Sequence, residues 1–179
     1  MKLFVAAAGL LLISSPALAE TTPWVGATAG ININGGGVSI AGRAGVDTTI
    51  GKNAFIGIGL GAGKNGAKDC YDSYLNLGDQ LCIKGGRELL AEARLGYETN
   101  GKTKIYGVLG YTSLGVKGTY TYRGQTGVSP TSTLNGVSAG FGVETMIGSK
   151  AFLRSEFRYG NYEGGVTSTS FMPTIGFKL

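Results

Sequence analysis

The stretch AFIGIGLGAG, residues 54–63, decides the fold, because glycines alternate with apolar residues through most of its length. Alternation with a period of two gives a β-strand two different faces, whereas on a helix it would spread the glycines around the axis. A phosphate-binding P-loop is excluded, since that motif needs glycine at 58 and Ser or Thr at 65, where the chain has Ile58 and Asn65. The stretch therefore predicts a strand with one apolar face and one bare face, the bare face being formed by Gly57, Gly59, Gly61 and Gly63.

The same alternation recurs along the chain and predicts eight strands. Their ranges are 24–33, 38–50, 54–63, 87–99, 104–116, 136–147, 151–160 and 168–179. Each is close to the roughly 9 to 11 residues that cross a bilayer at a tilt. Both faces of 104–116 are mostly apolar, so the sequence does not decide which of them meets lipid. No internal run approaches the roughly 18 uninterrupted apolar residues of a membrane helix.

The connections between these strands alternate in length. The short links GKN (51–53), NGK (100–102) and GSK (148–150) alternate with long polar connections at 64–86 and 117–135. Tight turns at one end and long loops at the other are typical of outer-membrane barrels. We therefore expect an all-β fold, an eight-stranded antiparallel up-and-down transmembrane β-barrel with both termini on the periplasmic side.

The first twenty residues, MKLFVAAAGLLLISSPALAE, have the layout of a secretory signal peptide. Lys2 is followed by an apolar run that is too short to span a bilayer, and Ala17-Leu18-Ala19 forms a small-residue exit. We expect residues 1–19 to be removed and residues 20–179 to form a single barrel domain.

Charged residues within the predicted strands are mostly arginine and carboxylate, whereas most lysines fall in turns and loops. Arginine pairs with carboxylates in bidentate fashion where water is scarce, and an eight-stranded cylinder is just wide enough to be filled by side chains. The bare face at 57–63 would leave room for two of the long arginines, Arg43 and Arg94. We predict an interior charge network of Arg43, Asp47, Glu92, Arg94, Glu144, Arg154, Glu156 and Arg158. Alternation alone leaves open a soluble lipocalin-like barrel, in which the apolar face turns inward.

The amino-acid composition argues against several classes of binding and catalytic function. The net charge of +5 is scattered, which gives no basis for nucleic-acid binding, and the chain has no histidine, the usual general base and a common metal ligand. Cys70 and Cys82 are the only cysteines, and in an exported protein such a pair predicts a disulfide rather than a zinc site. We expect no catalysis, no metal and no cofactor.

Three segments resemble the opacity-type, OmpA-like outer-membrane barrel proteins of Gram-negative bacteria. FLRSEFRYGNYEGG (152–165) is similar to that family's penultimate strand, YGVLGYTSLGVKG (106–118) to its fifth strand, and PTIGFKL (173–179) to its closing strand. The resemblance implies a cell-surface protein inserted by the barrel-assembly machinery, with Phe177 and Leu179 as the assembly signal. Two features depart from the pattern: the chain ends in Leu179 rather than phenylalanine, and Pro173 predicts a bulge or an open seam beside the first strand.

The resemblance implies a structural and surface-interaction role in envelope integrity, adhesion or host contact. A small or weakly conducting pore is the alternative. The expected partners are outer-membrane lipid, lipopolysaccharide, the assembly machinery and a surface ligand at loops 64–86 and 117–135, with the protein a monomer. Tyr120 and Tyr122 are expected to extend a strand pair above the membrane as part of the aromatic girdle, whereas the role of Tyr71 and Tyr74 stays open.

Overall fold

The computed structural model describes residues 20–33, 36–73, 75, 77–99, 101–123, 125–127 and 129–179, and the regular structure in them is almost entirely β. Its elements are β1 (Thr21–Asn32), β2 (Val38–Ile50), β3 (Ala54–Asn65), β4 (Lys68–Asp72), β5 (Asp79–Thr99), β6 (Thr103–Tyr122), β7 (Gln125–Thr126), β8 (Thr131–Met146), β9 (Ala151–Tyr162), the 3-10 turn η1 (Glu163–Gly165) and β10 (Thr167–Lys178). The expected signal peptide, residues 1–19, and Tyr74 lie outside the described residues.

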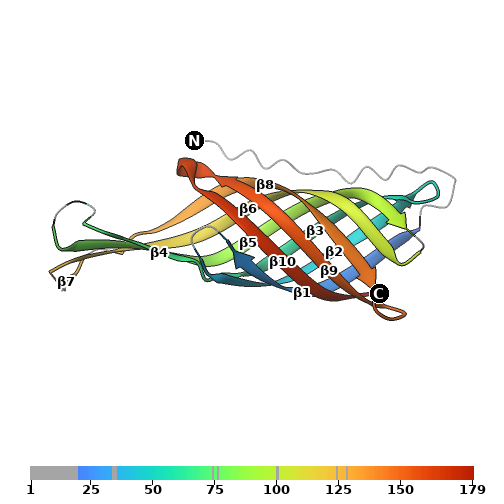
Figure 1. The fold of residues 1–179 in the computed structure, drawn as a ribbon, viewed down its shortest axis with the longest axis horizontal. Coiled ribbons are helices and arrows are strands. Elements are labelled where there is room, and N and C mark those ends of the chain that lie inside the picture. Colours follow the sequence, from blue (N-terminus) through green and yellow to red (C-terminus); the bar gives the residue numbers. More distant parts are fainter. Residues whose placement is uncertain are drawn as a thin grey trace.

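Eight long strands of the described chain close into an antiparallel ring in the order β1, β2, β3, β5, β6, β8, β9 and β10, with β10 returning to β1 (Figure 1). The predicted eight-stranded barrel is confirmed. The tight turns at 51–53 and 100–102 depend on glycine, because Gly51 and Gly101 have φ angles of 65° and 64°. These turns and the C-terminus lie at the end of the barrel opposite the longer connections (Figure 1).

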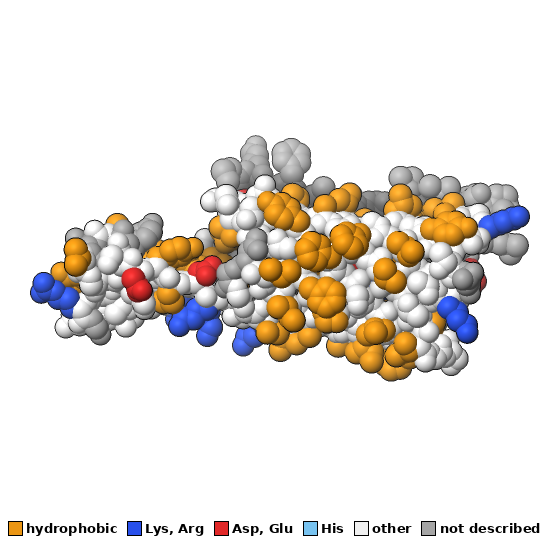
Figure 2. Space-filling view, in the orientation of Figure 1, with side chains coloured by type: hydrophobic (Ala, Val, Ile, Leu, Met, Phe, Trp, Pro, Cys, Tyr) orange, Lys and Arg blue, Asp and Glu red, His pale blue; other side chains and the backbone are white. Residues whose placement is uncertain are grey.

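Apolar side chains cover the outside of the barrel, and charged side chains fill the inside. Leu60, Leu109 and Phe141 are 69%, 66% and 65% exposed, whereas Arg154 and Glu156 are fully buried. Figure 2 shows the apolar side chains spread over the barrel wall and basic side chains towards its ends. This distribution suits a barrel surrounded by lipid and contradicts the lipocalin-like alternative, whose apolar face would point inward. No helix in the described residues is long and apolar enough to cross a membrane.

The sequence left the orientation of β6 undecided, and the structure settles it. Lys104, Tyr106 and Val108 are buried inside the barrel, whereas Ile105 and Leu109 are exposed on the outside. The inward face of β6 therefore carries a lysine and a tyrosine that the mostly apolar pattern concealed.

The connections at 64–86 and 117–135 were predicted as loops apart from a strand pair at Tyr120 and Tyr122. That strand pair is present, and the loop prediction is wrong for much of the remaining length. β5 and β6 continue far beyond the predicted strands, with β4 paired on β5 and β7 paired on β6. The register between β5 and β6 shifts between Gly85 and Glu88, so a bulge breaks the alternation at the predicted strand end. We call this projecting part the extension: β4, β7, residues 79–85 and residues 116–122 (Figure 1).

Pro173 interrupts the seam between β1 and β10 without bending it. Bridge pairs are present at Thr28 with Thr174 and at Ile31 with Phe171, but not at the two positions between them. The register is the same on both sides of the gap, so the predicted local opening is present and the bulge is not. The pairing of β10 with β9 runs through Pro173 unbroken, because the missing N–H affects only one side of the strand.

Candidate functional site

The barrel interior is the main concentration of chemistry in the described chain. All eight residues predicted for the charge network lie on its inward face with at most 6% of their surface exposed: Arg43 and Asp47 on β2, Glu92 and Arg94 on β5, Glu144 on β8, and Arg154, Glu156 and Arg158 on β9. We call these eight residues the inner network. Alternate residues of a strand point to the same face of the sheet, so charged residues from strands far apart in sequence lie together in the barrel interior.

The half of the inner network nearer the extension, which we call the upper half, is centred on Glu156. Its Oε2 accepts hydrogen bonds from Arg43 Nη1 at 2.7 Å and Arg158 Nη2 at 2.6 Å, and its Oε1 accepts one from the Tyr106 hydroxyl at 2.8 Å. Arg158 also donates to Glu92 from the opposite wall. These bonds connect β2, β5, β6 and β9 across the lumen.

The lower half consists of two arginine–carboxylate pairs. Arg154 donates from Nε at 3.0 Å and Nη2 at 2.6 Å to Glu144 Oε2, and Arg94 Nη2 donates to Asp47 Oδ1 at 2.6 Å. Arg94 Nη1 lies 3.7 Å from Glu144, which joins the two pairs. A buried charge is costly unless it is paired, so the side chains of this half depend on one another.

An aromatic side chain completes the lower half. Trp24, which is 1% exposed, has the Arg154 guanidinium 4.1 Å and the Arg94 guanidinium 4.5 Å from its ring centroid. Cation–π contacts contribute about 0.5 to 1 kcal/mol at exposed sites and about 2 kcal/mol when they are desolvated, as here. The indole therefore contacts one guanidinium group from each of the two arginine–carboxylate pairs.

The bare face of β3 lies beside the longest of these side chains. Arg43 pairs across the ladder with Gly61, and Arg94 pairs with Gly57. A Cβ atom added at Gly61 would lie 3.2 Å from Arg43 Cγ, and one at Gly59 would lie 3.1 Å from Glu92 Cγ. The fourth predicted glycine, Gly63, continues the same face towards the outer end of β3. Side chains on this face would occupy the space that the inner network fills.

Sequence reasoning missed several residues that touch the inner network: Trp24, Lys104, Tyr106, Phe152, Met172 and Lys178. Lys104 Nζ lies 3.0 Å from Asp47 Oδ2, and Lys178 Nζ lies 3.3 Å from Glu144 Oε1. Strand parity could have found them, since Trp24 shares a face with Thr28, and Lys104 and Tyr106 share one with Thr112. The expectation that lysines belong to turns concealed both lysines.

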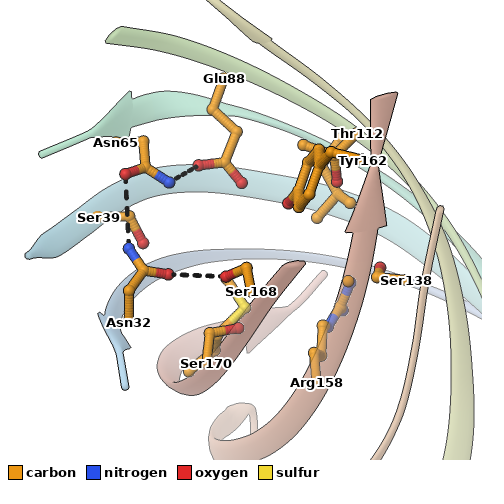
Figure 3. Close-up of a pocket in the computed structure, with 13 residues that line it drawn as sticks. Asn32, Ser39, Asn65, Glu88, Thr112, Ser138, Arg158, Tyr162, Ser168 and Ser170 are labelled. Atoms are coloured by element: carbon orange, nitrogen blue, oxygen red, sulfur yellow. Dashed lines mark hydrogen bonds between the residues drawn. The ribbon is translucent and has the colours of Figure 1, made fainter. Parts of the chain in front are cut away.

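A small polar cup lies above the inner network at the end that carries the extension (Figure 3). Ser168 donates to Asn32, Asn32 to Asn65, and Asn65 to Glu88, at 3.4, 3.5 and 3.3 Å. Figure 3 shows Tyr162 and Thr112 together on the other side of the cup and Arg158 below them. The cavity measures about 30 Å³, which is room for water molecules and for no larger ligand.

The extension carries the predicted disulfide, which is confirmed. Cys70 and Cys82 are bonded and face each other on β4 and β5. Tyr120 and Tyr122 lie on the extended part of β6, where the Tyr120 hydroxyl donates to Asp79 Oδ2 at 2.7 Å. Tyr71 is exposed on β4.

The remaining predicted residues lie at the opposite end. Phe177 and Leu179 are exposed, and the Leu179 N–H donates to the Pro23 carbonyl at 3.0 Å, which ties the chain end to β1. Within the residues that the structure describes, no cluster of three potential metal ligands is present.

Comparisons with known proteins agree with this architecture. Residues 5–177 match a family model described as outer membrane protein beta-barrel domain. A comparison with curated proteins gives no match.

Similar solved structures include Ail, the attachment invasion locus protein of Yersinia pestis, with a TM-score of 0.60 at 12% identity over 90% of this chain and 99% of that chain. The N-terminal β-barrel domain of Pseudomonas aeruginosa OprF has a TM-score of 0.58 at 10% identity over 90% and 100% of the two chains. A major outer membrane protein from Thermus thermophilus has a TM-score of 0.56 at 13% identity over 89% and 99%. At these identities the likeness concerns the fold.

Proposed function

Because the chain belongs to the outer membrane protein beta-barrel domain family, whose members are non-catalytic barrels of the outer membrane, we propose that it is a structural barrel whose extension makes contacts at the cell surface. The proposal rests on one observation: the charged side chains of the lumen pair with one another, whereas an extension made of β4, β7 and the outer parts of β5 and β6 projects beyond the barrel rim (Figure 1). The barrel anchors the protein stably in the membrane, and the extension projects far enough to contact a partner at the cell surface.

The tip of the extension has the character of a contact surface. Leu77 is 95% exposed and Leu75 is 69% exposed, and Tyr71 is exposed on the adjoining strand. Exposed apolar and aromatic side chains that are clustered on a projecting segment suit burial against a partner. The Cys70–Cys82 disulfide holds the two strands that carry this tip together, which lowers the entropy lost on binding.

The orientation follows from the same proposal. The extension faces the cell exterior, both termini face the periplasm, and residues 1–19 are removed after Ala19. Peptide sequencing of the protein from an outer-membrane fraction should begin at Glu20. Protease added to intact cells should cut the extension and leave the turns at 51–53, 100–102 and 148–150 untouched.

A binding assay tests the surface role. Bacteria that express the wild-type protein should adhere to cultured epithelial cells, and the variant Leu75→Ser/Leu77→Ser should adhere at the level of cells without the barrel. Ile147→Ser is the matched control, because Ile147 is 58% exposed beside the short turn at the opposite end. Equal adhesion of wild-type, variant and barrel-free cells would overturn the surface role. Ail of Yersinia pestis was crystallised with a heparin analogue, so immobilised heparin is a suitable second surface for the assay.

The competing function is a small pore. The inner network places buried, paired charges across the lumen, and the cup above it has a volume of about 30 Å³. Open aqueous channels occur in barrels of about 16 to 18 strands. Planar-bilayer recordings of the folded protein should show no steady conductance. A steady current at the level of a diffusion porin would replace the structural role with a pore.

A further inference from the structure

Five basic side chains lie together on the outward face where the extension leaves the barrel. Lys64 on β3 is directly opposite Arg87 on β5, and Lys68, Lys84 and Lys117 are directly opposite one another on β4, β5 and β6. All five are exposed. We call them the outer basic patch; Figure 2 shows basic side chains at this junction.

The outer basic patch has no internal counterion. Among the described residues, no carboxylate oxygen lies within 4 Å of any of its five cationic groups. Like charges directly opposite one another on neighbouring strands destabilise a sheet. Three lysines in one row on three strands therefore favour an anion that binds across them.

Two local features hold the row in place. The irregular register between Gly85 and Glu88 brings Lys84 onto the same outward face as Arg87, although the two residues are three positions apart. The Cys70–Cys82 disulfide lies two residues along the strands from Lys68 and Lys84 and fixes β4 beside β5. The positions of the charges are therefore set before any ligand arrives.

The patch borders a hollow in the outer wall. A space of about 580 Å³ adjoins Lys84, Arg87 and Lys117 and is otherwise lined by glycines, hydroxyl side chains and two apolar residues, Leu89 and Val116. The glycines leave the floor without side chains, so a bulky anionic group can approach the backbone. Thr131 and Thr133 stand beside Lys117 and Gly115 on the neighbouring strand and add hydroxyl donors.

An apolar furrow continues from the hollow down the barrel wall. It measures about 730 Å³, shares Leu89 and Ser113 with the hollow, and is lined on its outward side by Leu60, Ala62, Ala91 and Tyr111. The two lower members of the patch, Lys64 and Arg87, lie only two residues along their strands from Ala62 and Leu89. A cationic hollow joined to an apolar furrow matches a molecule with an anionic head and hydrocarbon chains.

We propose that the outer basic patch binds the phosphate groups of an outer-leaflet lipid, with its acyl chains lying in the furrow below. Basic clusters at the boundary of the hydrocarbon layer recognise anionic headgroups in this way. A free sulfated polysaccharide would satisfy the charges, but it would leave the furrow unused. The proposal rests on the outer-membrane location and on the orientation proposed above, with the extension outside the cell, and it does not depend on adhesion.

A titration of purified, folded full-length protein in uncharged detergent with lipopolysaccharide tests the site. The variant Lys84→Gln/Lys117→Gln should bind about 10- to 30-fold more weakly than wild type, since each basic group near a lipid surface contributes roughly a three- to fivefold factor. Lys52→Gln/Lys102→Gln is the matched control, because both lysines are exposed at the short turns, and it should bind as wild type does. Lys84→Arg/Lys117→Arg keeps the charge and should bind within about twofold of wild type.

Three further measurements separate the candidate ligands. Dephosphorylated lipopolysaccharide should bind the wild type as weakly as intact lipopolysaccharide binds the double glutamine variant, and inorganic phosphate should compete only at high concentration. Heparin should bind more weakly than lipopolysaccharide. Gel migration before and after boiling shows that each variant is folded. Equal lipopolysaccharide affinity of the folded glutamine variant and wild type would overturn the proposal, as would tighter, patch-dependent binding of heparin.

Discussion

The inward face of the barrel holds arginines and carboxylates within bonding distance of one another, whereas the outward face at the base of the extension holds five cations that have no carboxylate within 4 Å among the described residues. On β5, Glu92 and Arg94 are buried and paired, and Lys84 and Arg87 are exposed and face other cations. Burial removes water as a partner, so the inner charges must neutralise one another. Exposure leaves the outer charges free to serve a ligand. The contrast separates the part of the molecule that sustains the fold from the part that offers binding energy.

The largest effect is expected at Glu156, where two arginines and a tyrosine converge. Glu156→Gln leaves the buried Arg43 and Arg158 charges with Glu92 as their one remaining shared carboxylate, so that one positive charge lacks a partner, which should lower the free energy of unfolding by about 3 to 5 kcal/mol. Urea unfolding in phospholipid vesicles measures this, with fluorescence from Trp24, the only tryptophan of the chain.

Glu98→Gln is the control for that measurement. The Glu98 side chain is 31% exposed and 4.0 Å from Lys104, so its loss should cost less than about 1 kcal/mol. Equal losses for the two variants would show that buried and exposed carboxylates contribute alike, and the contrast between the faces would fail.

The disulfide should act on the extension alone. In Cys70→Ser/Cys82→Ser, opening of the extension should become easier by about 3 kcal/mol in the chain-entropy model. Trypsin should then cut the folded protein faster after Lys68 and Lys84, while the urea midpoint of the barrel stays the same. A matching fall in barrel stability would mean that the extension and the barrel unfold as one unit.

The third comparison is between a glycine on the inward face of the barrel wall and a glycine on its outward face. Leucine at Gly59 would collide with Glu92 and Trp24, whereas a Cβ at Gly42, on the outward face, meets no atom within 4 Å. Gly59→Leu should lower stability by about 1 to 3 kcal/mol and reduce the fraction of heat-modifiable barrel, and Gly42→Leu should do neither. Normal assembly of both variants would contradict the role of the bare face as space for the inner network.

The sequence predicted the barrel well because apolar and polar residues alternate in a strand that has one face against lipid and the other inside the barrel. Arg154, Glu156 and Arg158 were assigned correctly to one face for that reason. The interior partners on β6 were missed because Lys104 and Tyr106 alternate with apolar residues on both sides, so that neither face looked polar.

Alternation predicted only part of the extension. Residues 119–122 alternate between threonine and tyrosine, which is why Tyr120 and Tyr122 were expected in a strand pair. On β5 the irregular register between Gly85 and Glu88 shifts the pattern and hides the strand at 79–85. The residue pattern of one segment does not indicate which strand it pairs with, so the pairing of β4 with β5 could not be predicted. The row of Lys68, Lys84 and Lys117 therefore becomes visible only when the register is known.

The smallest expected effect comes from a charge reversal on the outer face, which creates there an opposite-charge pair like those of the inner network. Lys117→Glu places a carboxylate directly opposite Lys84 and replaces a repulsion by an attraction. Cross-strand pairs of this kind contribute about 0.2 to 1 kcal/mol, so amide hydrogen exchange in the extension should slow slightly in uncharged detergent at low salt. The gain should vanish in about 1 M salt, where the Debye length falls to roughly 3 Å. A gain that persists in high salt would come from packing rather than charge, and no gain at low salt would mean that solvent already screens the lysine row. In either case the like charges would cost the protein nothing, and the argument that they favour a bound anion would lose its energetic basis.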